Sequence, residues 1–255
     1  MKVALIQTEL HWENPLKNRN HFESKINSIQ EPIDLILLPE MFSTGFTMHP
    51  FTVAESNNGA TLAWMKTIAK EKNSAIIGSL IIEESNQFFN RLVFVLPSGE
   101  IQTYDKRHLF SLAGEDKIYT AGTEKLIVDY KGFKICPLIC YDLRFPVFSR
   151  NTVDYDLLIY VANWPKPRIK AWDALLKGRA IENMCFTVGV NRIGTDYNKH
   201  EYSGHSQAID CFGNYLVEPQ DKEGVFIINL NKDELHEARG KFNFLADRDD
   251  FSILE

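Results

Sequence analysis

Three residues of different chemical type each end an apolar run that resembles a β-strand. Glu40 ends the run DLILLPE, Lys106 ends EIQTYDK, and Cys140 ends ICPLIC. In α/β proteins, the ends of strands and the loops that follow them expose the groups that do chemistry. Taken singly, residues of these types are more often a solvated carboxylate, an exposed lysine and an inert buried thiol.

Together the three residues supply what thiol-based acyl transfer needs. Cys140 provides a nucleophile, Glu40 a base that can take its proton, and Lys106 a cation that can hold negative charge on a carbonyl oxygen. Partial burial raises the pKa of a carboxyl group toward that of a general base, and a nearby ammonium keeps a thiolate populated. The combination predicts cysteine-dependent acyl transfer that requires no histidine.

Motifs for other chemistries are missing from the sequence. The 14 glycines form no Walker pattern and no Gly-x-Gly-x-x-Gly, so we expect no nucleotide cofactor. His200 and His205 are one residue too far apart for the helical zinc-protease pattern. Cys136 and Cys140 on a strand would lie about 13 Å apart, too far to share a metal. The segment Gly204–Ala208 lacks the last glycine of a serine nucleophile elbow. We therefore expect neither a metal site nor a serine nucleophile.

The composition is that of a globular protein with one large domain. The 255 residues are 44% hydrophobic and 24% charged, which excludes disordered, collagen-like and disulfide-scaffold classes. The formal net charge of −6 offers no overall positive field for a nucleic-acid backbone. We expect no nucleic-acid partner.

The sequence shows neither a secretion signal nor a membrane span. Only four apolar residues, Val3 to Ile6, precede Gln7, fewer than the roughly 7–15 of a signal peptide. The longest apolar runs, 33–38 and 75–82, are much shorter than the roughly 18 residues of a bilayer span. The 4 cysteines are few for this length and suit free thiols in a reducing compartment. We expect a cytoplasmic protein with no membrane partner.

The elements that must position the three residues alternate between strands and helices, which predicts an α/β fold. Ten expected strands exceed the usual sheet of about four to six, so two packed sheets or one very large sheet are needed. Glycine-containing turns at 97–100, 130–133 and 211–214 favour antiparallel hairpins mixed with strand–helix crossovers, rather than a barrel of eight βα units. The expected strands are 3–7, 33–38, 75–82, 92–96, 126–129, 133–139, 157–161, 186–191, 206–211 and 225–230.

Four segments are predicted to be helical. They are 15–29, 59–72, 169–184 and 233–239, and the third has the clearest apolar stripe, in which Trp172 is expected to pack in the core. No repeat or long linker divides the chain, so we expect residues 1–255 to form a single domain. The segment 243–255 is expected to wrap around the body or to contact a partner subunit.

The residues around the three candidates resemble known family motifs. The segments LLPEMF (37–42), YDKRHLF (104–110) and ICYDLRFP (139–146) resemble the Glu-Lys-Cys triad motifs of the nitrilase, or carbon-nitrogen hydrolase, superfamily. The resemblance covers essentially the whole chain, with the motifs in the family's order. Within the superfamily, YVANWP (160–165) and RAIEN (179–183) look most like the bacterial omega-amidase branch, which deaminates 2-oxoglutaramate and 2-oxosuccinamate.

This resemblance implies a fold, an assembly and a reaction. The fold is a four-layer α-β-β-α sandwich with two mixed sheets, the assembly is a homodimer or higher homo-oligomer, and no cofactor is required. Glu40 is implied to be the general base, Cys140 the nucleophile and Lys106 the oxyanion-stabilising cation, aided by the backbone N–H of Tyr141. The implied reaction converts a small amide to a carboxylic acid and ammonia through a thioester.

Many members of the superfamily have a second glutamate beyond the lysine motif. Glu115 is the best positional match here, and Asp116 and Glu124 are weaker ones. Glu115 would hold Lys106 or the substrate amide in place, unless it is an exposed loop carboxylate.

The substrate's far carboxylate requires a cation or several hydrogen-bond donors. Arg144 lies within the nucleophile motif and is the candidate for this contact, the alternative being a structural ion pair beneath the site. The aromatic residues Trp164, Phe46, Phe110 and Tyr141 follow or flank the motifs and are candidates for the wall of a small pocket, although aromatic side chains more often pack in the core.

Several functions remain open at this point. The same triad could act on deaminated glutathione, an N-carbamoyl amine or a nitrile. A catalytically silent relative that binds a small ligand is the alternative from a different class, and it would be favoured only if a member of the triad were missing. All three members are present.

Overall fold

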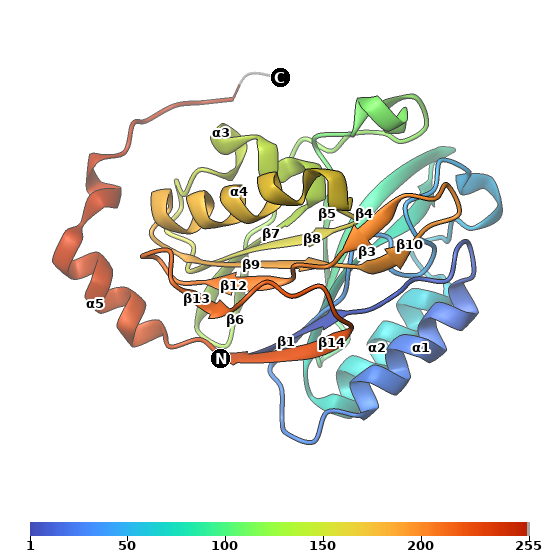
Figure 1. Cartoon of the computed structure of the whole chain (residues 1–255), viewed down its shortest axis with the longest axis horizontal. Helices are drawn as coiled ribbons and strands as arrows, with labels where there is room; N and C mark the ends of the chain where they lie inside the picture. The colour runs from blue at the N-terminus through green and yellow to red at the C-terminus, as the bar shows by residue number, and fades with distance from the viewer. Residues whose placement is uncertain (254–255) are drawn as a thin grey trace.

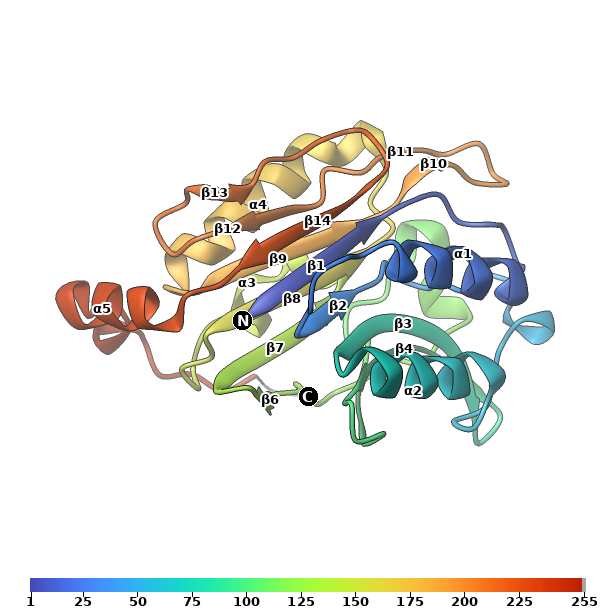
Figure 2. The same ribbon diagram turned by 90° about the horizontal axis from the view of Figure 1, so that it is seen from below.

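The computed structural model describes residues 1–253, so positions 254 and 255 of the expected tail lie outside the described residues. Two six-stranded mixed sheets pack face to face (Figures 1 and 2). Helices cover the outer face of each sheet, which confirms the expected four-layer α/β sandwich.

In the first sheet the strand order is β14-β1-β2-β3-β4-β5. The neighbours β1, β2 and β3 run parallel, and the other pairs are antiparallel. Its strands are β1 (Lys2–Gln7), β2 (Leu35–Leu37), β3 (Ala75–Glu84), β4 (Gln87–Val95), β5 (Ile101–Asp105) and β14 (Gly224–Asn229).

The second sheet has the order β13-β12-β9-β8-β7-β6, with β7, β8 and β9 parallel. A separate hairpin is formed by β10 (Ile193–Thr195) and β11 (Glu201–Ser203). The strands of the second sheet are β6 (Val128–Tyr130), β7 (Phe133–Ile139), β8 (Leu157–Ala162), β9 (Phe186–Asn191), β12 (Gln207–Ile209) and β13 (Tyr215–Val217).

The helices α1 and α2 cover the first sheet, whereas α4 covers the second, with the short α3 beside it (Figure 1). The chain after β14 forms α5 and then an extended arm, residues 243–253, at the periphery of the sandwich (Figure 1), where Arg248 pairs with Asp154. No helix within residues 1–253 is long and apolar enough to cross a membrane. The helices are α1 (Pro15–Asn27), α2 (Ala60–Lys72), α3 (Pro146–Ser149), α4 (Ile169–Glu182) and α5 (Lys232–Phe242).

Side chains of β1 alternate between the two faces of the first sheet, and this alternation explains how the sheet packs against the layers on both sides. Val3 and Leu5 belong to the apolar cluster that includes the second sheet, whereas Ala4 and Ile6 pack in the cluster that contains Phe22 of α1. Successive strand residues point to opposite faces, so one apolar strand contributes to two layers of core. A run that is apolar at every position is therefore expected in a sheet covered on both sides.

The expected strands are found, with boundary shifts, and the structure adds others. β5 coincides with the run that Lys106 ends. β10, β11 and β13 are further short strands of three residues each. Most of their side chains are partly or fully exposed, and such short segments carry little apolar periodicity. The turns at 97–100, 130–133 and 211–214 join the antiparallel pairs β4–β5, β6–β7 and β12–β13, as predicted.

Candidate active site

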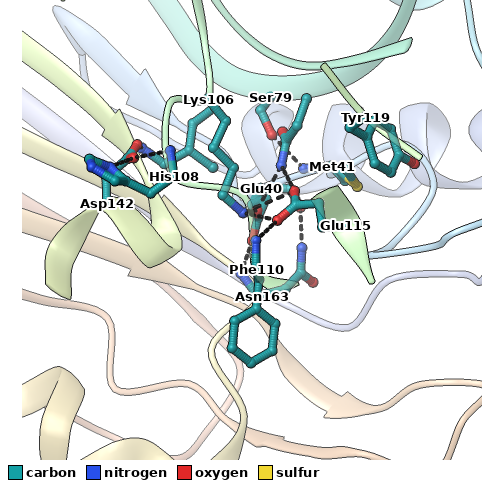
Figure 3. A network of polar contacts seen from close by, with 12 residues as sticks. Glu40, Met41, Ser79, Lys106, His108, Phe110, Glu115, Tyr119, Asp142 and Asn163 are labelled. Carbon is teal, nitrogen blue, oxygen red and sulfur yellow. Dashed lines mark hydrogen bonds and ion pairs between the residues drawn. The ribbon is translucent and has the colours of Figure 1, made fainter. Parts of the chain in front are cut away.

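Residues that follow strands of both sheets converge at one end of the sandwich. Glu40 follows β2, Lys106 follows β5, Cys140 follows β7, and Asn163 follows β8. Glu115 joins them from the 3₁₀ helix Glu115–Lys117 (Figure 3). All five side chains are buried, so the polar groups of this cluster interact with one another in place of water.

The Lys106 ammonium lies between two carboxylates. Its Nζ donates to Glu40 Oε1 at 2.8 Å and to Glu115 Oε2 at 2.9 Å and Oε1 at 3.1 Å. Burial by itself lowers the pKa of Lys106, but the negative charges of Glu115 and Glu40 outweigh it and raise this pKa above its ordinary value. Lys106 is therefore a permanent cation at the base of the site.

The Glu40 carboxylate is held through both oxygens. Oε1 accepts hydrogen bonds from Lys106 and, at 2.8 Å, from Asn90 Nδ2, and Oε2 accepts one from the backbone N–H of Asn163 at 2.9 Å. The side-chain amide of Asn163 donates to the backbone oxygen of Glu40 at 2.5 Å. These contacts fix the orientation of the carboxylate, as a general base requires.

Glu115 is the second buried carboxylate of the cluster. It accepts hydrogen bonds from Lys106, from Asn90 Nδ2 at 3.1 Å and from the backbone N–H of Phe110 at 2.6 Å. Burial and the nearby charge of Glu40 raise the pKa of Glu115, against the opposing effect of Lys106. The weaker candidates, Asp116 and Glu124, are exposed and lie outside the cavity lining.

Cys140 occupies a sharp turn between β7 and the 3₁₀ helix Cys140–Arg144. Its backbone has φ = +43°, a left-handed conformation that is uncommon for residues other than glycine. Burial, followed by the negative charge of Glu40 and a side-chain hydrogen bond to it, raises the pKa of the Cys140 thiol well above its ordinary value, whereas Lys106 lowers it. The resting side chain is therefore a neutral thiol, which lines the same cavity as Glu40.

The backbone N–H of Tyr141 belongs to the first turn of the same 3₁₀ helix. Amides in the first turn of a helix have no acceptor inside that helix. The N–H of Tyr141 is therefore free of an intrahelical partner, directly beside Cys140.

A cavity of about 430 Å³ opens over these groups. This volume suits a small ligand. Glu40, Lys106 and Cys140 line it together with all five residues that the sequence suggested for substrate contact, which are Phe46, Phe110, Tyr141, Arg144 and Trp164.

Arg144 does not form a structural ion pair beneath the site. It is exposed, its guanidinium carbon lies 4.9 Å from the centre of the Trp164 ring, and within residues 1–253 it pairs with no carboxylate. Phe46 also contacts the charged cluster, since Lys106 Nζ lies 5.3 Å from the centre of its ring. Both side chains therefore belong to the cavity wall.

Sequence reasoning missed several residues of the site. Asn90, which bridges Glu40 and Glu115, sits in the middle of β4 with no motif around it, whereas Asn163 lies inside the segment 160–165 that carried the family resemblance. The outer cavity is lined by further residues from distant segments, namely Trp12, Met48, His49, Leu112, Arg168, Asp196, Asn198, His200 and Tyr202.

Comparison with known proteins agrees with this geometry. The model of the carbon-nitrogen hydrolase family matches residues 2–240. The omega-amidase YafV of Escherichia coli K12 is 40% identical over 99% of this chain and 98% of that protein. The 2-oxoglutaramate amidase of Bacillus subtilis is 31% identical over 93% of each chain.

Solved structures of the superfamily share the fold. A CN-hydrolase superfamily protein from Xanthomonas campestris, described with an arsenic adduct in its active site, has a TM-score of 0.97 and 41% identity, covering 99% of this chain and 98% of that one. Fold, motifs and full-length relatives therefore agree that the chain belongs to the carbon-nitrogen hydrolase family, in the branch of the nitrilase superfamily that contains the omega-amidases.

Proposed function

We propose that the protein is a cysteine-dependent omega-amidase. It hydrolyses the terminal amide of 2-oxo acid monoamides, such as 2-oxoglutaramate and 2-oxosuccinamate, to the dicarboxylate and ammonia through a thioester on Cys140. The observation that carries this proposal is the Glu40 carboxylate, held by Lys106, Asn90 and Asn163 and lining the same cavity as the Cys140 thiol. The full-length relatives named omega-amidase and 2-oxoglutaramate amidase support the choice of substrate.

In the first half of the reaction, Glu40 takes the thiol proton while sulfur attacks the amide carbon. The resulting oxyanion is stabilised by Lys106 and the Tyr141 N–H. An ammonium has three N–H donors. If one N–H is shared between the two oxygens of Glu115 and a second serves Glu40, the third is left for the oxyanion. Protonated Glu40 then gives its proton to the leaving nitrogen, the C–N bond breaks, and ammonia departs from the thioester.

In the second half, Glu40 is again a carboxylate and removes a proton from water. The hydroxide attacks the thioester carbon, the C–S bond breaks, and the sulfur regains a proton from Glu40. One carboxylate therefore acts in turn as base and acid. Glu115 keeps Lys106 oriented through both halves by its two contacts with the ammonium.

Substrate contact is proposed for the residues that wall the cavity. Trp164, Phe46, Phe110 and Tyr141 enclose the short carbon chain, and Arg144 faces the carboxylate at its far end. A guanidinium that pairs with no carboxylate of residues 1–253 suits this contact.

We also propose that the protein forms a homodimer or higher homo-oligomer through its C-terminal arm. The arm follows α5 (Figure 1) and exposes Phe244, Phe251 and Ile253, next to the exposed Phe242 at the end of α5. Exposed aromatic and aliphatic side chains on an extended segment are typical of a surface that a partner covers.

The test of the amidase proposal is ammonia release by the purified protein and by its Cys140→Ala variant. The substrates are 2-oxoglutaramate, 2-oxosuccinamate, glutamine, a deaminated-glutathione analogue, an N-carbamoyl amine and a simple nitrile. We expect preferred turnover of the two 2-oxo amides, lost in the variant, with a melting temperature close to that of the wild type. Preference for another compound would move the substrate assignment, and turnover that survives Cys140→Ala would reject the mechanism.

A further inference from the structure

Most charged groups in the cavity are already paired within the protein. Lys106 pairs with both Glu40, at 2.8 Å, and Glu115, at 2.9 Å. Asp196 accepts hydrogen bonds from the Tyr202 hydroxyl and from the backbone N–H of His200, both at 2.9 Å. His49 lies 3.5 Å from Glu13 and faces solvent. These groups leave little charge available for a ligand.

Two arginines are the exception. Arg144 and Arg168 line the cavity, and within the described part of the chain neither guanidinium pairs with a carboxylate. Arg168 is half-buried at the end of the 3₁₀ helix Lys166–Arg168, so its charge is partly shielded from solvent. Two unpaired cations at one small cavity create a positive potential that attracts an anion.

Both arginines are held against aromatic rings that also line the cavity. The guanidinium carbon of Arg144 lies 4.9 Å from the centre of the Trp164 ring, and that of Arg168 lies 5.1 Å from the centre of the Phe110 ring. The indole N–H of Trp164 donates to the backbone oxygen of Arg168 at 2.8 Å, which ties the two arginine sites together. The guanidinium groups are thereby placed by packing and still have unused N–H donors.

We propose that Arg168 and Arg144 form a two-arginine subsite that binds the carboxylate and adjacent keto oxygen of a 2-oxo acid amide and discriminates against the 2-amino acid amide. This inference rests on the proposed omega-amidase function. A carboxylate next to a keto group offers several acceptors in one plane, which suits the planar donor sets of two guanidinium groups. In glutamine, an ammonium replaces the keto group and is repelled by the same two cations, while the oxygens of Asp196 are engaged elsewhere.

The test compares three substrates that share the terminal amide. 2-Oxoglutaramate carries the carboxylate and keto group, glutamine carries the carboxylate and an ammonium, and pentanamide carries no charge. The wild type is assayed beside Arg168→Ala, Arg168→Lys and the control Lys170→Ala. The control removes an exposed cation two residues away that does not line the cavity.

For Arg168→Ala we expect KM for 2-oxoglutaramate to rise about 10- to 100-fold, the range set by the loss of hydrogen bonds to a charged group. Pentanamide hydrolysis stays within about twofold of the wild type, and the preference for 2-oxoglutaramate over glutamine falls by about tenfold. Arg168→Lys keeps the charge but not the planar donor set. Its KM for 2-oxoglutaramate therefore lies between that of the wild type and that of Arg168→Ala. Lys170→Ala behaves as the wild type.

Other outcomes distinguish failure of the two-arginine subsite from failure of the proposed amidase function. An unchanged KM in Arg168→Ala, with the wild type still preferring 2-oxo amides, would overturn the subsite and leave the proposed function standing. An equal loss for 2-oxoglutaramate and pentanamide would assign Arg168 a purely structural role. A wild-type protein that hydrolyses pentanamide but not 2-oxoglutaramate would overturn both.

Discussion

The phenol of Tyr104 donates a hydrogen bond of 2.8 Å to the carboxylate of Asp142. Tyr104 lies two residues before Lys106 and Asp142 two residues after Cys140, so this bond joins the segment that carries the ammonium to the turn that carries the thiol. Asp142 also accepts from the backbone N–H groups of Ile139 at 2.9 Å and His108 at 3.1 Å. The spacing between cation and thiol is thus set by a fully buried carboxylate.

Replacing Tyr104 by Phe is expected to lower kcat several-fold with little change in KM. The substitution removes one donor to Asp142 and costs about 1–2 kcal/mol of stability. Urea unfolding and steady-state kinetics measure the two effects. The matched control is Tyr155→Phe, which removes another buried phenol hydrogen bond, to the backbone of Ser149. Equal losses of kcat in both variants would contradict a specific role for the bond between Tyr104 and Asp142.

The Glu40→Gln variant is expected to abolish both formation and hydrolysis of the thioester. Both steps need a carboxylate that accepts and returns a proton, and an amide cannot do so. Intact-protein mass spectrometry after mixing with 2-oxoglutaramate, together with ammonia release, follows the two steps. Rapid accumulation of the acyl-enzyme would show that another group acts as the base in the first step.

The Glu115→Gln variant is expected to reduce kcat about 10- to 100-fold, because Lys106 loses one of its two anionic partners and its orientation. KM should change little. The control is Asp116→Asn, which neutralises the neighbouring exposed carboxylate. Wild-type kcat in Glu115→Gln would leave Glu115 without a part in positioning the ammonium.

The raised pKa of Cys140 predicts a loss of stability at alkaline pH. The ordinary pKa of the thiol is 9.0 and the folded value lies well above it, so above pH 9 the unfolded state loses a proton that the native state keeps. The wild type should therefore lose about 1.4 kcal/mol per pH unit above pH 9 relative to Cys140→Ala and Cys140→Ser.

Melting curves between pH 7 and pH 10.5 measure this difference. Each kcal/mol corresponds to roughly 2–4 °C in a chain of this size. The two variants serve as controls for each other because neither carries the thiol. Parallel curves for all three proteins would contradict the expected proton linkage.

The double variant Phe244→Asp/Phe251→Asp is expected to shift the protein toward a monomer, since two charges would face an apolar partner surface. Light scattering coupled to size-exclusion chromatography measures the mass. Phe51→Asp is the control, because Phe51 is 85% exposed and lies outside the arm. An unchanged mass in the double variant would exclude the arm as the contact between subunits.

The three strands that end in the candidate catalytic residues could be predicted from the sequence. Apolar runs ending in Glu40, Lys106 and Cys140 are local patterns, and strand periodicity and turn residues act over a few neighbouring positions. For the same reason the α/β class and the need for two sheets could be predicted. The short strands β10, β11 and β13 carry too little periodicity to be recognised in this way.

How the side chains of the site come together could not be predicted from the sequence, because it depends on contacts between distant segments. The hydrogen bond between Asn163 and Glu40 spans 123 residues of sequence, and that between Asn90 and Glu40 spans 50. Likewise, only packing places Arg168 against Phe110 at the cavity that Cys140 lines. Such contacts depend on how two sheets stack and on which side chains lose water together, and no local pattern in the sequence encodes that arrangement.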